Sequence, residues 1–223
     1  MSYPTLCVDN FLENPDEIVE YSNRLNFIKA ENGRWPGLRV DLNLDPVGLF
    51  LMQKISTVIH PHRTEKFYIQ CQCFFQKINN CYGDTGWIHA DYPDELTAII
   101  YLSKNKNSGT SLYKPKSFQS WPIHDNEKRN FYKSLKKPKN YDKYLKENND
   151  QFEETAYFES VYNRLLIFNS NTFHGVRNFN NKENDRLTFI AFIRSINDVN
   201  LKNGYLESKK LAPFMFVNNT NNS

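Results

Sequence analysis

The sequence Trp87-Ile88-His89-Ala90-Asp91-Tyr92 places a histidine and an aspartate two positions apart. In an extended segment successive side chains point to opposite faces, so His89 and Asp91 project from the same face. An imidazole nitrogen and a carboxylate oxygen then face one point, which makes two thirds of the 2-His-1-carboxylate triad that binds non-heme Fe(II). A triplet this short also occurs as an ordinary surface or core pair, so the chemistry depends on a third ligand from elsewhere in the chain.

A second histidine lies far along the chain, after a predicted strand and a turn. His174 follows the apolar strand 164–168 and can meet His89 only through the fold. Taken alone, His174 would be interpreted as a surface or core histidine rather than as a ligand. Arg186 opens the next predicted strand, and a guanidinium entering a buried strand needs an anionic partner. That partner is either a structural carboxylate such as Asp185 or the carboxylate of a bound cosubstrate.

Short segments rich in strand-forming residues recur at regular intervals from residue 67 onward, joined by turns rich in Gly and Asn. This spacing predicts antiparallel sheets rather than parallel βαβ units. The number of segments suits a jelly roll, with strands expected at 67–76, 87–91, 97–103, 110–113, 156–161, 164–168, 170–176 and 186–193. We therefore expect a mainly β (α+β) protein: a double-stranded β-helix, or jelly roll, with N-terminal helices and a helical insertion.

The length of 223 residues suits one domain, because β-sandwiches and barrels often reach this size as single units. We expect the domain to span residues 1–223. Its expected parts are an N-terminal helical part at 1–63, a jelly-roll core at 64–116 and 156–198, an inserted lid at 117–155, and a tail at 199–223.

Two helices are predicted ahead of the strands. The first covers residues 14–27, with a capping Asn followed by Pro at the first helical position, and the second starts at Asp45 and ends before Pro61. The loop 33–39 between them contains a Pro and two Gly, which exclude regular structure. Its Trp35 either pins the loop onto the core or reaches a ligand. This loop is a second candidate lid.

The segment 114–154 interleaves lysines with aromatic side chains and predicts one or two short helices laid over the barrel. A basic patch with aromatics can bind nucleic acid, but acidic residues in the same segment dilute the positive field. The whole chain carries 28 basic and 25 acidic residues, a net charge of +3. This balance disfavours a nucleic-acid partner and favours a lid whose aromatic face packs down.

The four cysteines, Cys7, Cys71, Cys73 and Cys81, lack the paired spacing of a zinc site and predict reduced thiols. The first ten residues lack a secretory signal, and we expect no apolar run long enough to cross a membrane. These features predict a cytoplasmic protein with no membrane partner. The apolar run 211–217 is compatible with packing on its own chain or with pairing two chains in a homodimer.

His89, Asp91, His174 and Arg186, in this order and with strands around each, resemble the Fe(II)/2-oxoglutarate-dependent dioxygenase superfamily. The resemblance covers roughly residues 67–195 and looks most like the prolyl-hydroxylase branch. It implies that His89, Asp91 and His174 are the metal ligands and the catalytic residues. It also implies that Arg186 binds the distal carboxylate of 2-oxoglutarate.

Two further residues are assigned by the same resemblance. Tyr101, immediately before a Leu, would share the distal carboxylate, and Thr188 could add a hydroxyl from the strand that begins with Arg186. The Gly-Gly pair often found before the fourth strand reads Ser108-Gly109 in this sequence. This departure bears on the branch more than on the chemistry.

The resemblance implies Fe(II) as cofactor, 2-oxoglutarate and O2 as cosubstrates, and hydroxylation of a small molecule or of a protein or peptide side chain, with release of succinate and CO2. One alternative is nucleic-acid demethylation by the same chemistry. Another is a cupin-like binding or scaffold protein that kept the roll without the activity. The residues expected to face the substrate are Gln70, Gln72, Trp87, Tyr113, Arg177 and Trp35.

Overall fold

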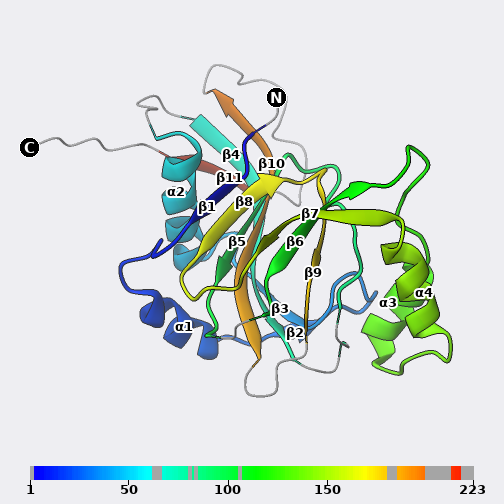
Figure 1. The fold of residues 1–223 in the computed structure, drawn as a ribbon. Coiled ribbons are helices and arrows are strands. Elements are labelled where there is room, and N and C mark those ends of the chain that lie inside the picture. The colour runs from blue at the N-terminus through cyan, green and yellow to red at the C-terminus, as the bar shows by residue number, and fades with distance from the viewer. Residues whose placement is uncertain are drawn as a thin grey trace, which may run out of the picture.

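A large antiparallel sheet organises the structure, a computed structural model that describes residues 3–61, 67–79, 82, 85–104, 107–179, 185–198 and 212–216. Its strands follow the order β1-β8-β5-β10-β4-β3-β2, and β11 pairs with β4 (Figure 1). The bounds are β1 Leu6–Val8, β2 Ile28–Lys29, β3 Leu38–Asp41, β4 Phe67–Ile78, β5 Leu96–Tyr101, β8 Leu165–Asn169, β10 Arg186–Asp198 and β11 Ala212–Phe216.

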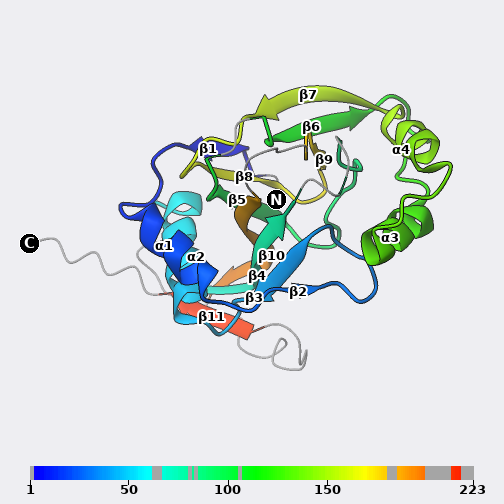
Figure 2. The same cartoon turned by 90° about the horizontal axis from the view of Figure 1, so that it is seen from below.

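A smaller sheet of three antiparallel strands faces the large one. Its order is β7-β6-β9, with β6 Thr110–Pro115, β7 Phe152–Phe158 and β9 Phe173–Val176. Figure 2 shows β6 and β7 on the opposite side of the molecule from β4, β3 and β2. Two facing sheets of this kind confirm the predicted jelly roll.

The period of two along each strand separates a helix-covered core from the space between the sheets. Helices α1 (Pro15–Asn23) and α2 (Pro46–Ile59) cover the outer face of the large sheet. Phe189 and Ala191 of β10 are buried in the core that these helices close. Arg186, Ile190 and Phe192 lie on the opposite face and line a cavity between the sheets. The helices thus cover the large sheet from outside, which leaves its inner face available for a site.

The first helix is shorter than predicted. It ends at Asn23 rather than at residue 27. The backbone N–H groups of Arg24 and Leu25 donate to the carbonyl oxygens of Tyr21 and Ser22, at 3.0 and 3.2 Å. This three-residue spacing tightens the last turn and stops the helix, and the chain then continues into β2.

Two local predictions from the sequence were wrong. Residues 87–91 are an irregular extended segment with one isolated bridge, between His89 and His174, instead of a regular strand. The reason is that the side chains of Asn148 and Asn149 form hydrogen bonds with the backbone of Ile88, which is then not available for strand pairing. The loop 33–39 was expected to lack regular structure throughout, yet β3 begins at Leu38 and pairs with β4.

The insertion forms two helices, as predicted: α3 (Asp125–Ser134) and α4 (Tyr141–Asn149). Their aromatic side chains Phe131, Tyr132 and Tyr141 pack in a second core cluster with Trp87 and Phe179. The helices therefore rest on the segment that contains the His-x-Asp triplet. Among the described residues, no helix is long and apolar enough to cross a bilayer.

The apolar run near the C-terminus, predicted at 211–217, contains β11, which pairs with β4 of the same chain. Ala212 lies opposite Cys71 in this register, and Phe216 lies opposite Phe67. Of the two arrangements compatible with the sequence, the structure shows pairing within the chain.

Asp45 is the N-cap of α2, and its loss should destabilise the fold. Its Oδ1 accepts hydrogen bonds from the backbone N–H groups of Val47 (2.8 Å) and Gly48 (3.4 Å). We expect Asp45→Ala to lower the free energy of unfolding by about 1 kcal/mol, the usual cost of losing such a cap. Urea denaturation checks this, with Asp45→Asn as a matched control that keeps the capping oxygen and most of the stability. An unchanged midpoint in Asp45→Ala would contradict the role of the cap.

Candidate metal centre

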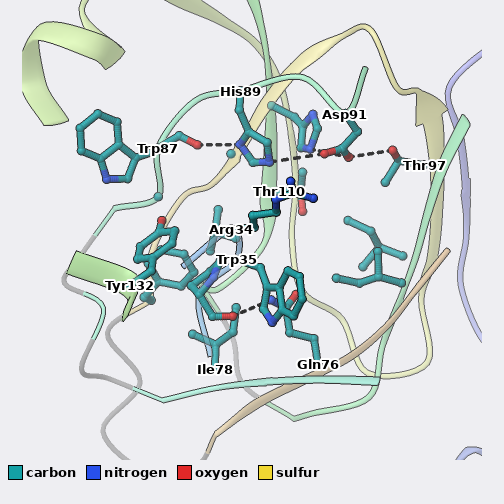
Figure 3. A pocket seen from close by; sticks show the side chains of 18 of the residues that line it. Arg34, Trp35, Gln76, Ile78, Trp87, His89, Asp91, Thr97, Thr110 and Tyr132 are labelled. Carbon is teal, nitrogen blue, oxygen red and sulfur yellow. Dashed lines mark hydrogen bonds and ion pairs between the residues drawn. The ribbon is translucent and has the colours of Figure 1, made fainter. Parts of the chain in front are cut away.

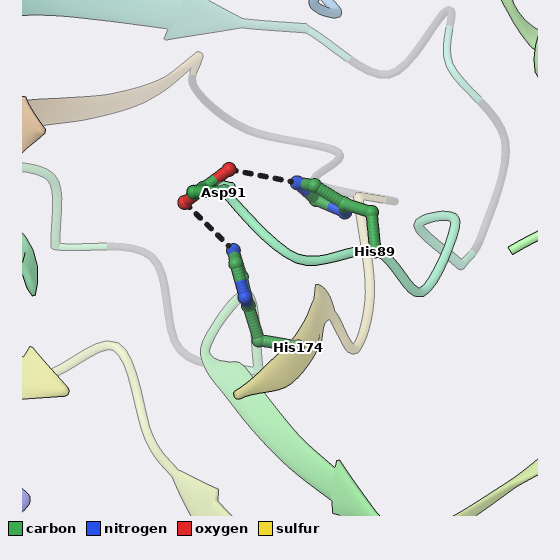
Figure 4. Close-up of side chains that lie close together, drawn as sticks. All are labelled: His89, Asp91 and His174. Carbon is green, nitrogen blue, oxygen red and sulfur yellow. Dashed lines mark ion pairs between the residues drawn. The ribbon is translucent and has the colours of Figure 1, made fainter. Parts of the chain in front are cut away.

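Three side chains from two distant parts of the chain converge in the space between the sheets (Figure 4). His89 and Asp91 come from the segment between β4 and β5, and His174 comes from β9. One ligand atom of each lies within 4.8 Å of the others. His174 Nε2 is 3.2 Å from Asp91 Oδ2, and His89 Nε2 is 3.6 Å from Asp91 Oδ1. The third ligand that the His-x-Asp triplet required is therefore present.

Backbone carbonyl groups orient both imidazole rings. The Nδ1 atom of His89 lies 2.9 Å from the carbonyl oxygen of Trp87, and the Nδ1 atom of His174 lies 2.9 Å from that of Thr172. A carbonyl oxygen only accepts, so each Nδ1 carries the proton in the neutral ring, and the Nε2 lone pair faces the centre. Metal-binding histidines are typically held in this way.

The backbone also joins the two histidines. The N–H of His89 donates to the carbonyl oxygen of His174 at 3.0 Å, and the reverse bond measures 2.8 Å. Asp91 is tied to the same place, because its N–H donates to the carbonyl oxygen of Ser170 at 2.8 Å. The hydroxyl of Thr97 donates to Asp91 Oδ2 at 2.9 Å. The carboxylate is thus positioned before any ion binds.

The three groups influence one another's protonation. Burial, then the neighbouring His174, lowers the pKa of His89 to about 4. Burial by itself would lower the pKa of His174, but the charge of Asp91 and its hydrogen bond outweigh burial and raise that pKa. Burial opposes ionisation of Asp91 too, yet His174 and His89 hold the pKa of Asp91 well below its usual value. The centre therefore keeps an ionised carboxylate beside imidazoles.

The donor set suits Fe(II). Two imidazole nitrogens and one carboxylate oxygen on one side of a point form the facial triad of non-heme iron oxygenases, which leaves the remaining coordination positions open. Around this point lies a cavity of about 250 Å³, lined by residues of both sheets. His89, Asp91 and His174 would be the protein ligands of a metal bound here.

Arg186 lines the same cavity and is almost fully buried. Its Nε donates to the carbonyl oxygen of Ser108 at 2.9 Å, and its Cζ lies 5.6 Å from the centroid of the Tyr101 ring. Burial lowers the pKa of Arg186, and the phenol of Tyr101 partly offsets this effect. Among the described residues, Arg186 has no carboxylate partner in an ion pair. A buried cation of this kind is suited to an anionic ligand.

Tyr101 and Thr188, predicted to help Arg186, lie beside it but not in the cavity lining. They face each other across β5 and β10. The Tyr101 hydroxyl donates to Thr110 Oγ1 at 2.8 Å, and Thr110 itself lines the cavity. The Thr188 hydroxyl is buried and makes no hydrogen bond within the described part of the chain. Thr110 was not predicted as a site residue, although it lies at the start of a predicted strand.

Of the side chains expected to face the substrate, Trp35 and Trp87 line the cavity (Figure 3). Trp87 also has a structural partner, because its Nε1 donates to the Tyr141 hydroxyl at 2.7 Å. The other four, Gln70, Gln72, Tyr113 and Arg177, are not among the lining residues.

The misplacements have geometric reasons. Gln70 and Gln72 share the cavity face of β4 with Gln76, but only Gln76 lies far enough along the strand to reach the cavity. Arg177 stacks on the Tyr157 ring at 4.4 Å, outside the site. The period of two predicts a shared face correctly, but not the position along the strand.

The sequence also missed two asparagines that hold the metal-binding segment. Asn149 Oδ1 accepts a hydrogen bond from the N–H of Ile88 at 3.1 Å, and its Nδ2 donates to the carbonyl oxygen of Gly86 at 3.0 Å. Asn148 Nδ2 donates to the carbonyl oxygen of Ile88 at 3.1 Å. Both lie at the end of α4, where the sequence shows only a polar helix terminus. The insertion therefore supports the metal centre in addition to covering it.

Replacing Asn149 with alanine should weaken metal binding although no ligand is lost. Freed from two hydrogen bonds, the segment that carries His89 would sample other conformations, and we expect the Kd for Fe(II) to rise about tenfold. Anaerobic Fe(II) titration checks this, with Asn126→Ala, at an exposed position of α3, as the control. Equal Fe(II) affinity in both variants would show that the two hydrogen bonds do not position the ligand.

Solved structures share this fold. HygX from Streptomyces hygroscopicus, crystallised with nickel and 2-oxoglutarate bound, matches 87% of this chain and 83% of its own with a TM-score of 0.55 at 11% identity. SnoN, a non-heme alpha ketoglutarate dependent epimerase from nogalamycin biosynthesis, matches 87% of this chain and 78% of its own with a TM-score of 0.53 at 13% identity. The chain thus has the fold of the 2-oxoglutarate-dependent oxygenases, as predicted.

At the level of sequence, a family model described as "Family of unknown function (DUF6445)" matches residues 2–193, and the chain belongs to this family. No curated protein matches the sequence. The prolyl-hydroxylase branch stays a prediction.

Proposed function

We propose that this protein is a non-heme Fe(II)- and 2-oxoglutarate-dependent dioxygenase that hydroxylates a small molecule or a protein or peptide side chain and releases succinate and CO2. One observation carries the proposal: the convergent triad of His89, Asp91 and His174 shares its cavity with the buried guanidinium of Arg186. A metal site and an anion site in one cavity match the two ends of 2-oxoglutarate.

When bound, Fe(II) supplies the redox chemistry that couples decarboxylation of 2-oxoglutarate by O2 to oxidation of the substrate. The protein's own contribution is positioning. The carbonyl oxygens of Trp87 and Thr172 keep the protons on Nδ1 of the two histidines, so both Nε2 atoms are available as ligands. Thr97 holds the carboxylate of Asp91 in place. Arg186 binds and orients the distal carboxylate of the cosubstrate, supported by Tyr101.

Exclusion of water is the remaining task, and apolar side chains of the cavity wall perform it. Trp87, Ile99 and Phe179 line the cavity and are nearly fully buried. Tyr132 of α3 lines it from the insertion, and Trp35 lines it from the loop before β3. The insertion and this loop form its cover, which fits their predicted role as lids.

The alternatives find less support. Five of the eight basic side chains in the insertion pair with neighbouring acids, which reduces the positive field available to nucleic acid: Lys128 and Arg129 with Asp125, Lys137 with Asp142, Lys143 with Glu147, and Lys146 with Asp150. A scaffold protein without activity would have no need for a complete ligand set. A cytoplasmic location forms part of the proposal, since Cys71 and Cys73 are free, buried thiols.

Anaerobic addition of Fe(II) and 2-oxoglutarate tests the proposal. We expect a weak visible charge-transfer band that requires both components, because the keto acid has to chelate the iron to produce it. Exposure to O2 should then yield succinate. A protein that binds Fe(II) but shows no band at saturating 2-oxoglutarate would be a binding protein rather than an oxygenase.

A further inference from the structure

Arg39 of β3 brings into the cavity a cation that the metal triad and the cosubstrate leave unused. Its side chain lines the same cavity as Asp91 and Arg186. Its Nε is buried and makes no hydrogen bond within the part of the chain that the structure describes. A buried charged donor without an acceptor costs more free energy than a typical hydrogen bond contributes. Such a group is expected to have a partner, and that partner can come from a ligand.

Three aromatic rings surround this guanidinium. The Cζ of Arg39 lies 4.7 Å from the ring centroid of Trp35, 5.2 Å from that of Phe74 and 5.5 Å from that of Phe192. Ring faces attract a cation but accept no conventional hydrogen bond, so they hold Arg39 in place and leave its Nε–H unpaired. The indole Nε1 of Trp35 is a second buried donor without a partner among the described residues. Trp35 and Arg39 thus bring two unpaired N–H donors to the lining of one cavity.

The charges in the cavity also favour an anionic ligand at Arg39. Burial lowers the pKa of Arg39 to about 10, which leaves the group protonated at neutral pH. Among the described residues, Asp91 is the one acid whose charge acts on it, and Asp91 is committed to the metal triad. Of the two carboxylates of 2-oxoglutarate, one belongs at the metal and the other at Arg186. Arg39 therefore still lacks a counter-charge once metal and cosubstrate are bound.

The loop that carries Trp35 is fixed at both ends. Gly33 has a φ of +66°, and a Cβ there would lie 2.1 Å from the backbone oxygen of Arg129 in α3. Gly37 has a φ of +75°, and a Cβ there would lie 2.1 Å from the backbone oxygen of Lys77 in β4. Only glycine tolerates both conditions. The loop that carries Trp35 is thus held in position before a ligand binds, which lowers the entropic cost of binding.

Figure 3 shows Arg34 and Trp35 between His89 and Asp91 on one side and Gln76 and Ile78 on the other. Gln76 Nε2 donates to the carbonyl oxygen of Pro36 at 2.7 Å, so the amide of Gln76 secures the loop. Gln76 also lies directly opposite Arg39 in the pairing of β3 with β4. The donors therefore lie within the cavity where a substrate has to approach the metal.

We propose that Arg39 and the indole N–H of Trp35 bind a carboxylate of the substrate, so that the enzyme oxidises a small carboxylic acid. This inference rests on the proposed function, since it concerns the substrate of the same site. The fork of a guanidinium matches the two oxygens of a carboxylate. The cavity of about 250 Å³ also has to hold the cosubstrate, which favours a small acid over a large ligand.

The test uses the full chain with Ni(II) in place of Fe(II), so that no turnover occurs, and with saturating 2-oxoglutarate. The probes are acetate, benzoate, indole-3-acetate and the N-acetyl amino acids, each compared with its own primary amide by calorimetric titration. At least one acid should bind, at least about tenfold more tightly than its amide, because an ion pair of this kind is lost in the amide. The proposal is overturned if no acid binds better than its amide.

Variants test whether Arg39 binds the acid and whether the anion bound there is the substrate or the cosubstrate. Arg39→Gln should remove the preference for the acid and leave the Kd for 2-oxoglutarate within about twofold of wild type. Arg186→Gln, in contrast, should raise the Kd for 2-oxoglutarate. Trp35→Phe keeps an aromatic ring and removes the N–H, and it should raise the Kd for the acid a fewfold. The control is Lys77→Gln, which removes a cation outside the cavity.

Two outcomes separate the possible failures. If Arg39→Gln weakens the binding of 2-oxoglutarate as strongly as Arg186→Gln does, the anion at Arg39 belongs to the cosubstrate. The inference is then wrong, while the proposed function stands. If wild-type protein fails to bind 2-oxoglutarate in the presence of metal, the proposed function itself fails. Should Arg39→Gln not fold, Arg39→Lys preserves the charge without the fork, and equal acid binding in this variant and wild type would contradict bidentate binding.

Discussion

Replacing His174 with alanine is expected to abolish tight Fe(II) binding, with a rise in Kd of more than about a hundredfold. Losing a group that only orients a metal ligand typically costs tenfold to a hundredfold in affinity, and losing the ligand itself costs more. The two remaining ligands, His89 and Asp91, come from one short segment and cannot hold three coordination positions. Anaerobic Fe(II) titration gives the Kd, and the charge-transfer band with 2-oxoglutarate should disappear in parallel.

His124→Ala is the matched control for this experiment. His124 also has a carboxylate partner, Glu147, at 2.9 Å, but it lies at the start of α3 and is not among the cavity-lining residues. We expect its loss to leave Fe(II) affinity unchanged. If His174→Ala bound Fe(II) as tightly as His124→Ala, the assignment of His174 as a ligand would be wrong, whatever the effect on activity.

Arg186→Gln is expected to keep Fe(II) but to require at least about thirtyfold more 2-oxoglutarate. Removing one partner of a buried, hydrogen-bonded charge pair costs about 2–5 kcal/mol, which corresponds to this factor or more. Arg186 is 3% exposed, so water cannot replace its charge at the ligand. The measurement is a titration of the charge-transfer band with 2-oxoglutarate at saturating Fe(II).

The control lies on the same strand. Arg194 of β10 is partly exposed, pairs with Asp94 at 3.0 Å and does not line the cavity. Arg194→Gln should leave both the Fe(II) and the 2-oxoglutarate affinities near those of wild type. Comparable loss of Fe(II) in Arg186→Gln and His174→Ala would contradict the division of roles, because only His174 is assigned to the metal.

Much of the fold was predictable because the side-chain periods of strands and helices span only a few neighbouring residues. The strand-forming residues of β4, β5 and β10 identified the strands, and Asp45 with Pro46 identified the start of α2. The His-x-Asp triplet placed two ligands on one face for the same reason, since the period of two is a property of extended backbone. The roles of His174 and Arg186 followed from the resemblance to a known superfamily.

Residues that act across elements were harder to predict. Asn148 and Asn149 lie at the end of a charged helix, and their role depends on α4 packing against Ile88, far away in the sequence. Arg39 was read as part of a loop, because β3 is short and forms only by pairing with β4. Gln70 was placed on the correct face, but it lies near the start of its strand, too early to reach the cavity.

The sequence by itself determined which side chains share a face and where the helices begin, because backbone geometry and capping act over a few residues. Only the tertiary structure decided which faces meet, how far along each strand the cavity lies, and which cations remain without a counter-charge. These properties depend on the pairing register of strands and on the packing of the two sheets. Both are set by contacts between residues distant in the chain.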